Sequence, residues 1–194
     1  MPMENGIFNI AKETVYAAED NSLENWTFED IDNSTVKAVS YTGPEEEVTI
    51  PEVVNGKTVT VIGKETFFRS GVKSVILPDT VTTIEDYAFS LSDIESVTIS
   101  KNVTQIGEYA FSECFKLAEF IVSADSEHYT SENRILYNKD KTSLLFVTNS
   151  YENEFTIPET VVNVKKGAFK NCEKNNIYKY SQRFRKCRCR GIKY

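Results

Sequence analysis

The chain has 194 residues, 40% of them apolar, and a formal net charge of −7, and this length is enough for one domain with its own core. The charge is unevenly spread, because residues 174–194 carry eight lysines and arginines and no acid, which leaves 14 basic against 29 acidic side chains before them. An acidic body lacks the basic folded face of a nucleic-acid-binding domain and should repel nucleic acid.

Residues 1–20 are predicted to be a disordered or leader-like segment. Residues 1–14 are polar and lack the apolar stretch of a signal peptide. Val15-Tyr16-Ala17, followed by Ala18-Glu19-Asp20, nevertheless has the small residues of a signal-peptidase site. We interpret the chain as secreted or attached to the cell surface, with a leader that is altered or absent here; the alternative is a chance tripeptide. No apolar run approaches the roughly 18 residues of a membrane-spanning helix.

Residues 21–47 are predicted to form a capping β-hairpin. Trp26–Phe28 and Val36–Tyr41 have the composition of strands, and Gly43-Pro44 marks a turn after them. The repeats that follow need a polar cap over their first coil, and this hairpin is the candidate.

Residues 48–174 contain an internal repeat of 22 residues. Val72–Phe89 is followed in the same register by Ile94–Phe111 and later by Phe155–Phe169, and an incomplete copy begins at Val48. Two apolar series recur at this spacing: Phe67, Phe89, Phe111 and Ile62, Ile84, Ile106. The phenylalanines are expected to stack as a buried column that Phe169 continues. Agreement at several positions at once predicts a repeat solenoid.

Each repeat is predicted to be a coil of two short strands and a helical turn. Val75 and Leu77 alternate with outward residues, as in a strand buried on one face, and Pro78 ends that strand. Residues 81–84 form a second extended piece, and residues 87–89 have the close apolar spacing of a helical turn. Parallel stacking of the coils predicts the following strands and columns: strands near 74–77, 96–99, 119–122 and 154–157, with columns Val75, Val97, Phe120 and Leu77, Ile99, Val122.

These repeats resemble the BspA-like leucine-rich repeats of bacterial and protozoan surface proteins, whose pattern runs roughly L-x-x-I-x-I-P-x-x-V-x-x-I-G-x-x-A-F-x-x-C. The resemblance covers about residues 48–174. It implies a right-handed solenoid, mainly β with short helical turns, that serves adhesion or recognition of proteins on other cells. Periodicity by itself predicts only the solenoid.

Residues 124–153 are predicted to contain an inserted β-hairpin. Phe111 and Phe169 are 58 residues apart, which is not a multiple of 22. Arg134–Tyr137 and Ser143–Val147 have the composition of strands on either side of a turn at Asn138–Lys141. The family that the repeats resemble often carries a similar insertion.

Residues 175–194 are predicted to be a basic, irregular tail. The repeat pattern stops after Cys172. The codons that these residues allow, read one nucleotide later, permit a set of residues that accommodates ITSINIPKGLESVGVEA, a further repeat in register. We interpret the tail as a frameshift product; the alternative is a genuine basic tail for nucleic acid or anionic lipid. The tail does not complete a coil, so the exposed apolar end should favour end-to-end self-association.

No catalytic residue, cofactor site or metal site is predicted. His128 is the only histidine and lies in the polar insertion, where no nucleophile–base motif surrounds it. Acidic runs such as Glu45–Glu47 could touch calcium, but most such runs are solvated. Cys187 and Cys189 supply only two of the four ligands that zinc needs.

Cys114 and Cys172 are predicted to be small buried residues at the last position of their repeats. Ser70 and Ser92 occupy this position in other coils. An intervening coil would hold the two sulfur-bearing residues roughly 10 Å apart, which is too far for a disulfide.

The candidate binding site is the concave face of the first sheet. Residues between the buried positions of its strands point outward: Lys73, Ser74, Ile76, Glu95, Ser96, Thr98, Glu119, Ile121 and Thr156. This mixed, shallow surface suits a protein or glycan ligand, so the predicted function is a non-catalytic interaction module. The alternatives are a structural spacer within a larger surface protein and, with less support, an enzyme.

Overall fold

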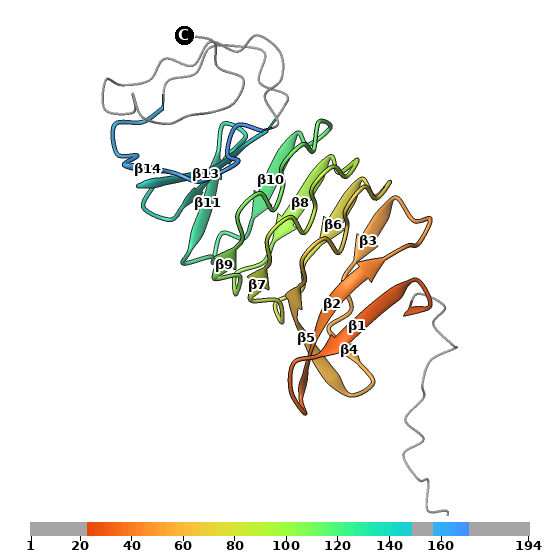
Figure 1. Cartoon of the computed structure of the whole chain (residues 1–194). Coiled ribbons are helices and arrows are strands. Elements are labelled where there is room, and N and C mark those ends of the chain that lie inside the picture. The colour runs from red at the N-terminus through yellow and green to blue at the C-terminus, as the bar shows by residue number, and fades with distance from the viewer. Residues whose placement is uncertain (1–22, 149–156, 171–194) are drawn as a thin grey trace, which may run out of the picture.

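The protein is a β-solenoid of about five turns, seen in a computed structural model that describes residues 23–148 and 157–170 (Figure 1). The described residues contain no α-helix. Their strands are β1 (Trp26–Asp30), β2 (Thr35–Tyr41), β3 (Glu47–Thr49), β4 (Val53–Val54), β5 (Lys57–Ile62), β6 (Ser74–Ile76), β7 (Thr83–Ile84), β8 (Ser96–Ile99), β9 (Gln105–Ile106), β10 (Glu119–Val122), β11 (Tyr129–Glu132), β12 (Ile135–Asn138), β13 (Ser143–Val147) and β14 (Asn163–Val164).

The first strands of successive coils form one parallel sheet in the order β10-β8-β6-β3. The register places Val75 beside Val97 and Val97 beside Phe120, so the predicted buried column is confirmed. Three of the four predicted strands therefore lie parallel in one sheet, and β3 adds a strand at its start. The fourth, near residues 154–157, falls mostly outside the described residues.

We call this sheet the first ladder. The second strands of the coils form a second ladder on the opposite side of the core. Strands β5, β7 and β9 pair in parallel, with Ile62 beside Ile84 and Ile84 beside Ile106. All three side chains are buried. The 22-residue series in the sequence is therefore a column in the structure.

A stack of phenylalanines fills the space between the two ladders. Phe67 and Phe89 stack with ring centroids 4.9 Å apart, and Phe89 and Phe111 with centroids 5.0 Å apart. Phe169 was expected to continue this stack, but that expectation is wrong: Phe169 packs in a separate core cluster. The ring of Phe146, from the inserted hairpin, meets Phe111 edge-on at 5.3 Å instead.

The segments expected to be helical turns are hydrogen-bonded turns without helix. In the second coil, Tyr87 and Leu91 have φ angles of 59° and 61°, and a left-handed residue ends a right-handed helical path. The same two positions are left-handed in the coils before and after. In the last coil the first of them is Gly167, with φ 81°, a residue that adopts this conformation without steric penalty.

The N-terminal hairpin is confirmed, and it also takes the place of half a coil. Strand β1 pairs antiparallel with β2, and β2 in turn pairs in parallel with β5, so that Ala38 lies beside Ile62. Gly63 N–H donates to the Ala38 carbonyl at 2.7 Å, as Glu85 N–H donates to the Ile62 carbonyl one coil later. Tyr41, at the end of β2, packs on Phe67 with centroids 5.7 Å apart. The hairpin therefore continues the second ladder.

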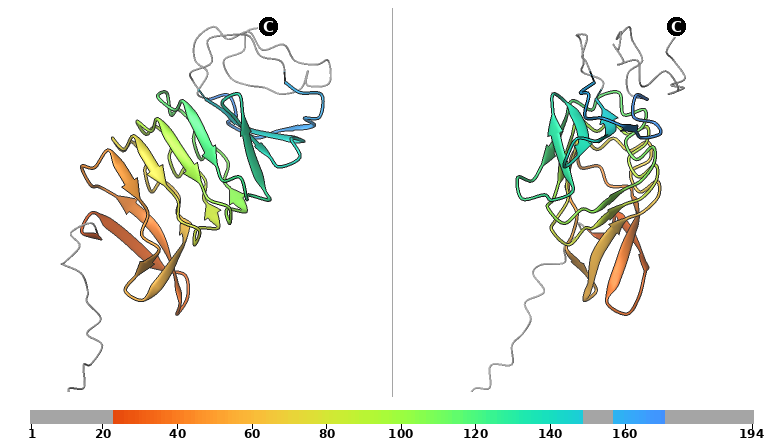
Figure 2. Two further views of the ribbon diagram at one scale, coloured as in Figure 1. Left: turned by 180° about the vertical axis from the view of Figure 1, so that it is seen from behind. Right: turned by 90° about the vertical axis from the view of Figure 1, so that its left-hand side faces the viewer.

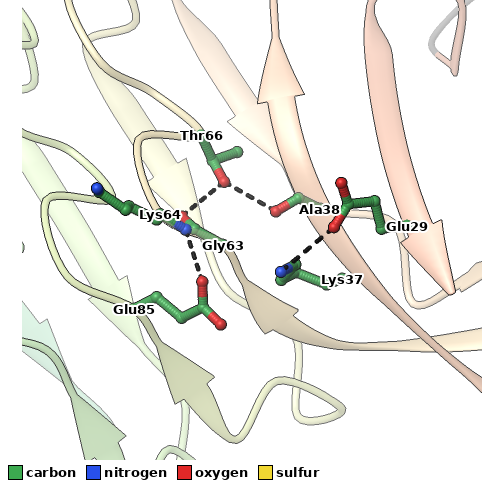
Figure 3. Close-up of polar contacts among 7 residues, drawn as sticks. All are labelled: Glu29, Lys37, Ala38, Gly63, Lys64, Thr66 and Glu85. Atoms are coloured by element: carbon green, nitrogen blue, oxygen red, sulfur yellow. Dashed lines mark hydrogen bonds and ion pairs between the residues drawn. The ribbon is translucent and has the colours of Figure 1, made fainter. Parts of the chain in front are cut away.

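Thr66 ties this hairpin to the first turn (Figure 3). Its Oγ1 lies 2.8 Å from the carbonyl oxygens of both Ala38 and Gly63. On the other side of the turn, Lys64 N–H donates to Glu85 Oε2 at 2.8 Å. The turn's own Thr66 and Glu85 of the next coil thus hold the turn backbone from both sides.

The inserted hairpin is confirmed as β12 and β13, which pair antiparallel around the predicted turn. The sequence did not indicate β11, which pairs antiparallel with the other edge of β12. Strand β13 stands in the place of a coil strand, because β14 of the last coil pairs in parallel with β13 and not with β9. Lys165 N–H donates to Leu144 O as Gly107 N–H donates to Ile84 O, at 2.8 and 2.7 Å. Figure 1 and Figure 2 show the resulting third sheet beyond the end of the ladders.

This hairpin is buried on both faces and separates two hydrophobic cores. Leu136 and Phe146 belong to the main core. A register shift beside Leu136 lets Leu145 face the main core as well. The second core consists of Ile135, Tyr137, Leu144, Val147, Ile157, Val161, Ala168 and Phe169. A strand buried on both faces has a continuous apolar sequence, which explains residues 143–147.

Cys114 is a small buried residue that faces the turn backbone, as expected. Its Sγ lies 3.0 Å from the Phe89 carbonyl oxygen and 3.6 Å from Ser92 Oγ, the equivalent position one coil earlier. Burial raises the pKa of the Cys114 thiol to about 12. The other three cysteines, the leader-like segment and the tail with its frameshift interpretation lie outside the described residues, so those domain boundaries remain predictions.

Candidate functional site

The outward face of sheet β3-β6-β8-β10 carries the predicted binding residues in two rows. Inward residues such as Val75 and Val97 are buried, so their strand neighbours point away from the core. The first row runs Glu47, Ser74, Ser96, Glu119, and the second runs Thr49, Ile76, Thr98, Ile121.

The first row is polar, with small residues at its centre and acids at its ends. Ser96 Oγ donates to Ser74 Oγ at 3.3 Å across neighbouring coils. Glu47 and Glu119 are exposed at the two edge strands. Because both central side chains are short, they leave the sheet backbone open to a flat ligand.

The second row is the apolar part of the face. Ile76 and Ile121 are each 47% exposed, although both are large hydrophobic side chains. Thr98 lies between them in register and presents a methyl group along with its hydroxyl. A row of this kind offers contact area to a partner but no enclosed pocket.

Charged residues form the rim one position before the strands. Lys73 Nζ lies 2.5 Å from Glu46 Oε1. This hydrogen bond is the main cause that raises the pKa of Lys73, and the nearby charges of Glu95 and Asp93 raise it further. Asp93 also pairs with Lys116 at 2.9 Å. Such exposed pairs contribute little stability but set the electrostatic pattern of the rim.

Of the nine predicted site residues, six lie on the face itself: Ser74, Ile76, Ser96, Thr98, Glu119 and Ile121. Lys73 and Glu95 lie at the rim, and Thr156 is outside the described residues. The prediction missed Glu47 and Thr49 on β3, although the incomplete repeat at Val48 was the signal that could have found them.

A second, open hollow of about 670 Å³ lies on the other side of the molecule, beside β9. Tyr129 and Lys165 line it together with the edge of the second ladder. Burial lowers the pKa of Lys165, and the charges of Asp86 and Glu108 partly restore it.

His128 is exposed in the loop before β11, as the sequence predicted, and its ring is 6.5 Å from that of Tyr129. Within residues 23–148 and 157–170, no group of three or more His, Cys, Asp or Glu side chains could hold a metal ion. None of the described residues forms a helix that could cross a membrane.

The repeats match the family model described as BspA type leucine rich repeat region, in six copies over residues 40–152 and 143–188. The chain belongs to this family. Leucine-rich repeat solenoids of this type are generally non-catalytic, and the family includes bacterial surface proteins. The second match runs to residue 188, into the segment predicted to be an irregular tail.

Solved structures of bacterial leucine-rich repeat proteins are similar to this chain. The T. pallidum leucine-rich repeat protein has a TM-score of 0.53 and 19% identity, with 77% of this chain and 66% of that chain covered. A leucine-rich repeat protein of Eubacterium ventriosum has a TM-score of 0.46 and 21% identity, with 83% and 58% covered. A leucine-rich cell surface protein of Faecalibacterium prausnitzii has a TM-score of 0.47 and 20% identity, with 80% and 69% covered.

These likenesses show the fold alone. The chain spans less than two thirds of the Eubacterium and T. pallidum proteins that it matches. A search of curated proteins found no match.

Proposed function

We propose that the protein is a non-enzymatic interaction module that binds a protein ligand through the outward face of sheet β3-β6-β8-β10. The observation that carries the proposal is the row in which Ile76 and Ile121, each 47% exposed, flank Thr98. Exposed apolar side chains within a polar rim are typical of protein-interaction surfaces. The acidic residues at both edges favour a partner with basic groups around its contact area.

We further propose that the module acts outside the cell, secreted or on the cell surface. The support is its family, which includes cell-surface proteins. End-to-end self-association through the C-terminal end also remains a proposal, and it rests on the predicted failure of the tail to complete a coil.

The experiment is a binding screen of the full chain against purified extracellular-matrix proteins, with a glycan array in parallel. Ile76→Glu/Ile121→Glu should weaken binding to any matrix protein that the chain retains by tenfold or more, about 1.4 kcal/mol, because two apolar contacts are replaced by charges. The matched control is Ile31→Glu/Val162→Glu, which changes two side chains that are each 50% exposed elsewhere.

Each outcome separates the alternatives. Loss of binding in the face variant but not in the control supports the proposal. Equal binding by both variants contradicts it. Binding only on the glycan array points to a glycan ligand, and no binding in either format favours a structural spacer. Turnover in a broad hydrolase screen would contradict the non-enzymatic assignment.

A further inference from the structure

Among residues 23–148 and 157–170, the second ladder ends at β9, because the last coil does not pair with this strand. Between the earlier coils, the carbonyl oxygen of Thr60 accepts a hydrogen bond from Thr82 N–H at 2.9 Å, and that of Thr82 accepts one from Thr104 N–H at 2.8 Å. By this pattern the carbonyl of Thr104 should accept the next coil. The last coil pairs with β13 instead, so its backbone does not reach β9.

Side chains supply the hydrogen bonds that this coil would have made. Tyr129 Oη donates to the Thr104 carbonyl at 2.9 Å, and it accepts the N–H of Ile106. Lys165 Nζ donates to the Ile106 carbonyl, the equivalent of the Ile84 carbonyl that accepts Gly107 N–H. One hydroxyl and one ammonium group therefore replace both donors and the acceptor of a missing strand.

The first ladder is closed in the same way at its last strand, β10. Ser131 Oγ donates to the Phe120 carbonyl oxygen at 2.7 Å. Tyr129 and Ser131 are two residues apart in β11, so both side chains project from one face of that strand. A single strand thus presents hydroxyl groups to the ends of both ladders; Figure 1 shows β11 beside β9 and β10.

We infer that Tyr129, Ser131 and Lys165 form a capping rung that closes the ends of both ladders to strand addition by a second copy of this chain. An open edge of parallel strands is a template for another strand. The strand it would accept is β3, because β3 is the first strand of the same sheet and pairs on its other side with β6. Docking of β3 onto β10 is a head-to-tail contact, which propagates into open filaments.

The sequence carries a sign of this role at position 165. This position, four residues before the repeat phenylalanine, is Gly63, Glu85 and Gly107 in the first three coils. The glycines have no side chain and Glu85 accepts a backbone N–H of the previous coil, whereas Lys165 uses its backbone N–H on Leu144 and its ammonium group as a donor on Ile106. Lys165 therefore bonds both to the inserted strand β13 and to β9, the last strand of the second ladder.

The test compares the full chain, the capping variant Tyr129→Phe/Ser131→Ala/Lys165→Met and the matched control Tyr109→Phe/Ser112→Ala/Lys166→Met. The control removes the same three polar groups nearby: Tyr109 stacks on Tyr87, Ser112 Oγ has no hydrogen-bond partner among the described residues, and Lys166 pairs with Glu108. In the capping variant, amide exchange at Ile106 should rise by at least about tenfold relative to Val97, because its acceptor is gone. The control should leave it unchanged.

Sedimentation velocity over a concentration series then measures strand addition. The capping variant should associate more strongly than both the full chain and the control, and the Thr49 amide on β3 should become protected as concentration rises. Association through the tail would be common to all three proteins, so only the difference counts. Unchanged exchange at Ile106, or faster exchange without added association, would overturn the inference. If the triple variant does not fold, Ser131→Ala alone should show added association; if it does not, the inference is overturned.

Discussion

The two ends of the phenylalanine stack are both closed by a hairpin, but in different ways. At the N-terminal end, β2 joins the ladder through backbone pairing with β5, and Trp26 meets Phe67 edge-on with centroids 5.6 Å apart. At the C-terminal end, Phe120 and Phe146 meet Phe111 edge-on at 5.2 and 5.3 Å, while side chains replace the backbone pairing.

This difference shows that a solenoid can close its core and its hydrogen-bond ladder separately. Aromatic rings close the core at both ends, because a stacked ring leaves an apolar face that must be covered. The ladder is continued by backbone at the start and ended by side chains at the insertion. Ending it there allows β13 to begin a new core on its far face.

The largest expected effect tests whether both ends of the stack are equally closed. Phe67 and Phe111 are almost fully buried, so Phe67→Ala and Phe111→Ala should each lower the free energy of unfolding by roughly 3–5 kcal/mol, measured by urea denaturation. Phe68→Ala is the control, because Phe68 is 39% exposed, and it should change stability by less than about 1 kcal/mol. A loss below about 1 kcal/mol for either buried variant would mean that its end of the stack is open.

A smaller loss is expected for Gly167→Ala, which tests how the last coil joins the third. Gly167 has φ 81°, and a Cβ there would lie 2.5 Å from Tyr109 Cδ1. The substitution should cost roughly 1–3 kcal/mol of unfolding free energy. Gly71→Ala is the matched control, since nothing lies within 4 Å of its added Cβ, and it should be neutral or stabilising by up to about 1 kcal/mol. Equal changes in unfolding free energy for the two variants would contradict the left-handed conformation of Gly167 and its close contact with Tyr109.

Thr66→Ala tests the hydroxyl that ties the N-terminal hairpin to the first turn. Loss of its bond to the Ala38 and Gly63 carbonyls should cost about 1 kcal/mol of unfolding free energy in the same assay. Ser112→Ala is the control, because Ser112 Oγ is buried without a hydrogen-bond partner among the described residues, so its removal should not destabilise. A larger loss for Ser112→Ala than for Thr66→Ala would contradict this assignment.

The smallest effect concerns the turns of the two hairpins. Hydrogen bonds from Ser34 and Thr35 lower the pKa of Asp32 to about 2, and bonds from Thr142 lower that of Asp140. Both pKa values are lower in the folded state than in the unfolded chain, so the stabilisation is fully present above pH 3.8. It is lost as the pH falls below 3.8, toward about 2 for Asp32. Carboxyl chemical shifts followed by NMR should show both groups titrating below 3.8, and normal values would contradict the turn geometry.

The regular coils could be predicted from the sequence because each buried position recurs every 22 residues. Agreement between copies predicted the strands at β6, β8 and β10, the column of Val75 and Val97, and most of the outward face. The helical turns were not confirmed, since apolar spacing alone does not reveal the left-handed φ angles at Tyr87 and Leu91.

The insertion was only partly predictable, because nothing there recurs. Its two apolar strands were recognisable, but the apolar run at residues 143–147 does not say that its two faces belong to different cores. Strand β11 is polar, and its role depends on a contact between Tyr129 and Thr104, 25 residues away. The displacement of Phe169 from the main stack follows from the same insertion.

The most direct test of this account is the hydrogen-bond partner of Lys165 N–H, measured by NMR as a scalar coupling across the hydrogen bond. If the inserted strand β13 takes the place of a coil, the Lys165 nitrogen couples to the carbonyl carbon of Leu144. If the last coil stacks directly on the third, as in an uninterrupted solenoid, the coupling is to the carbonyl carbon of Ile106, and the account is contradicted.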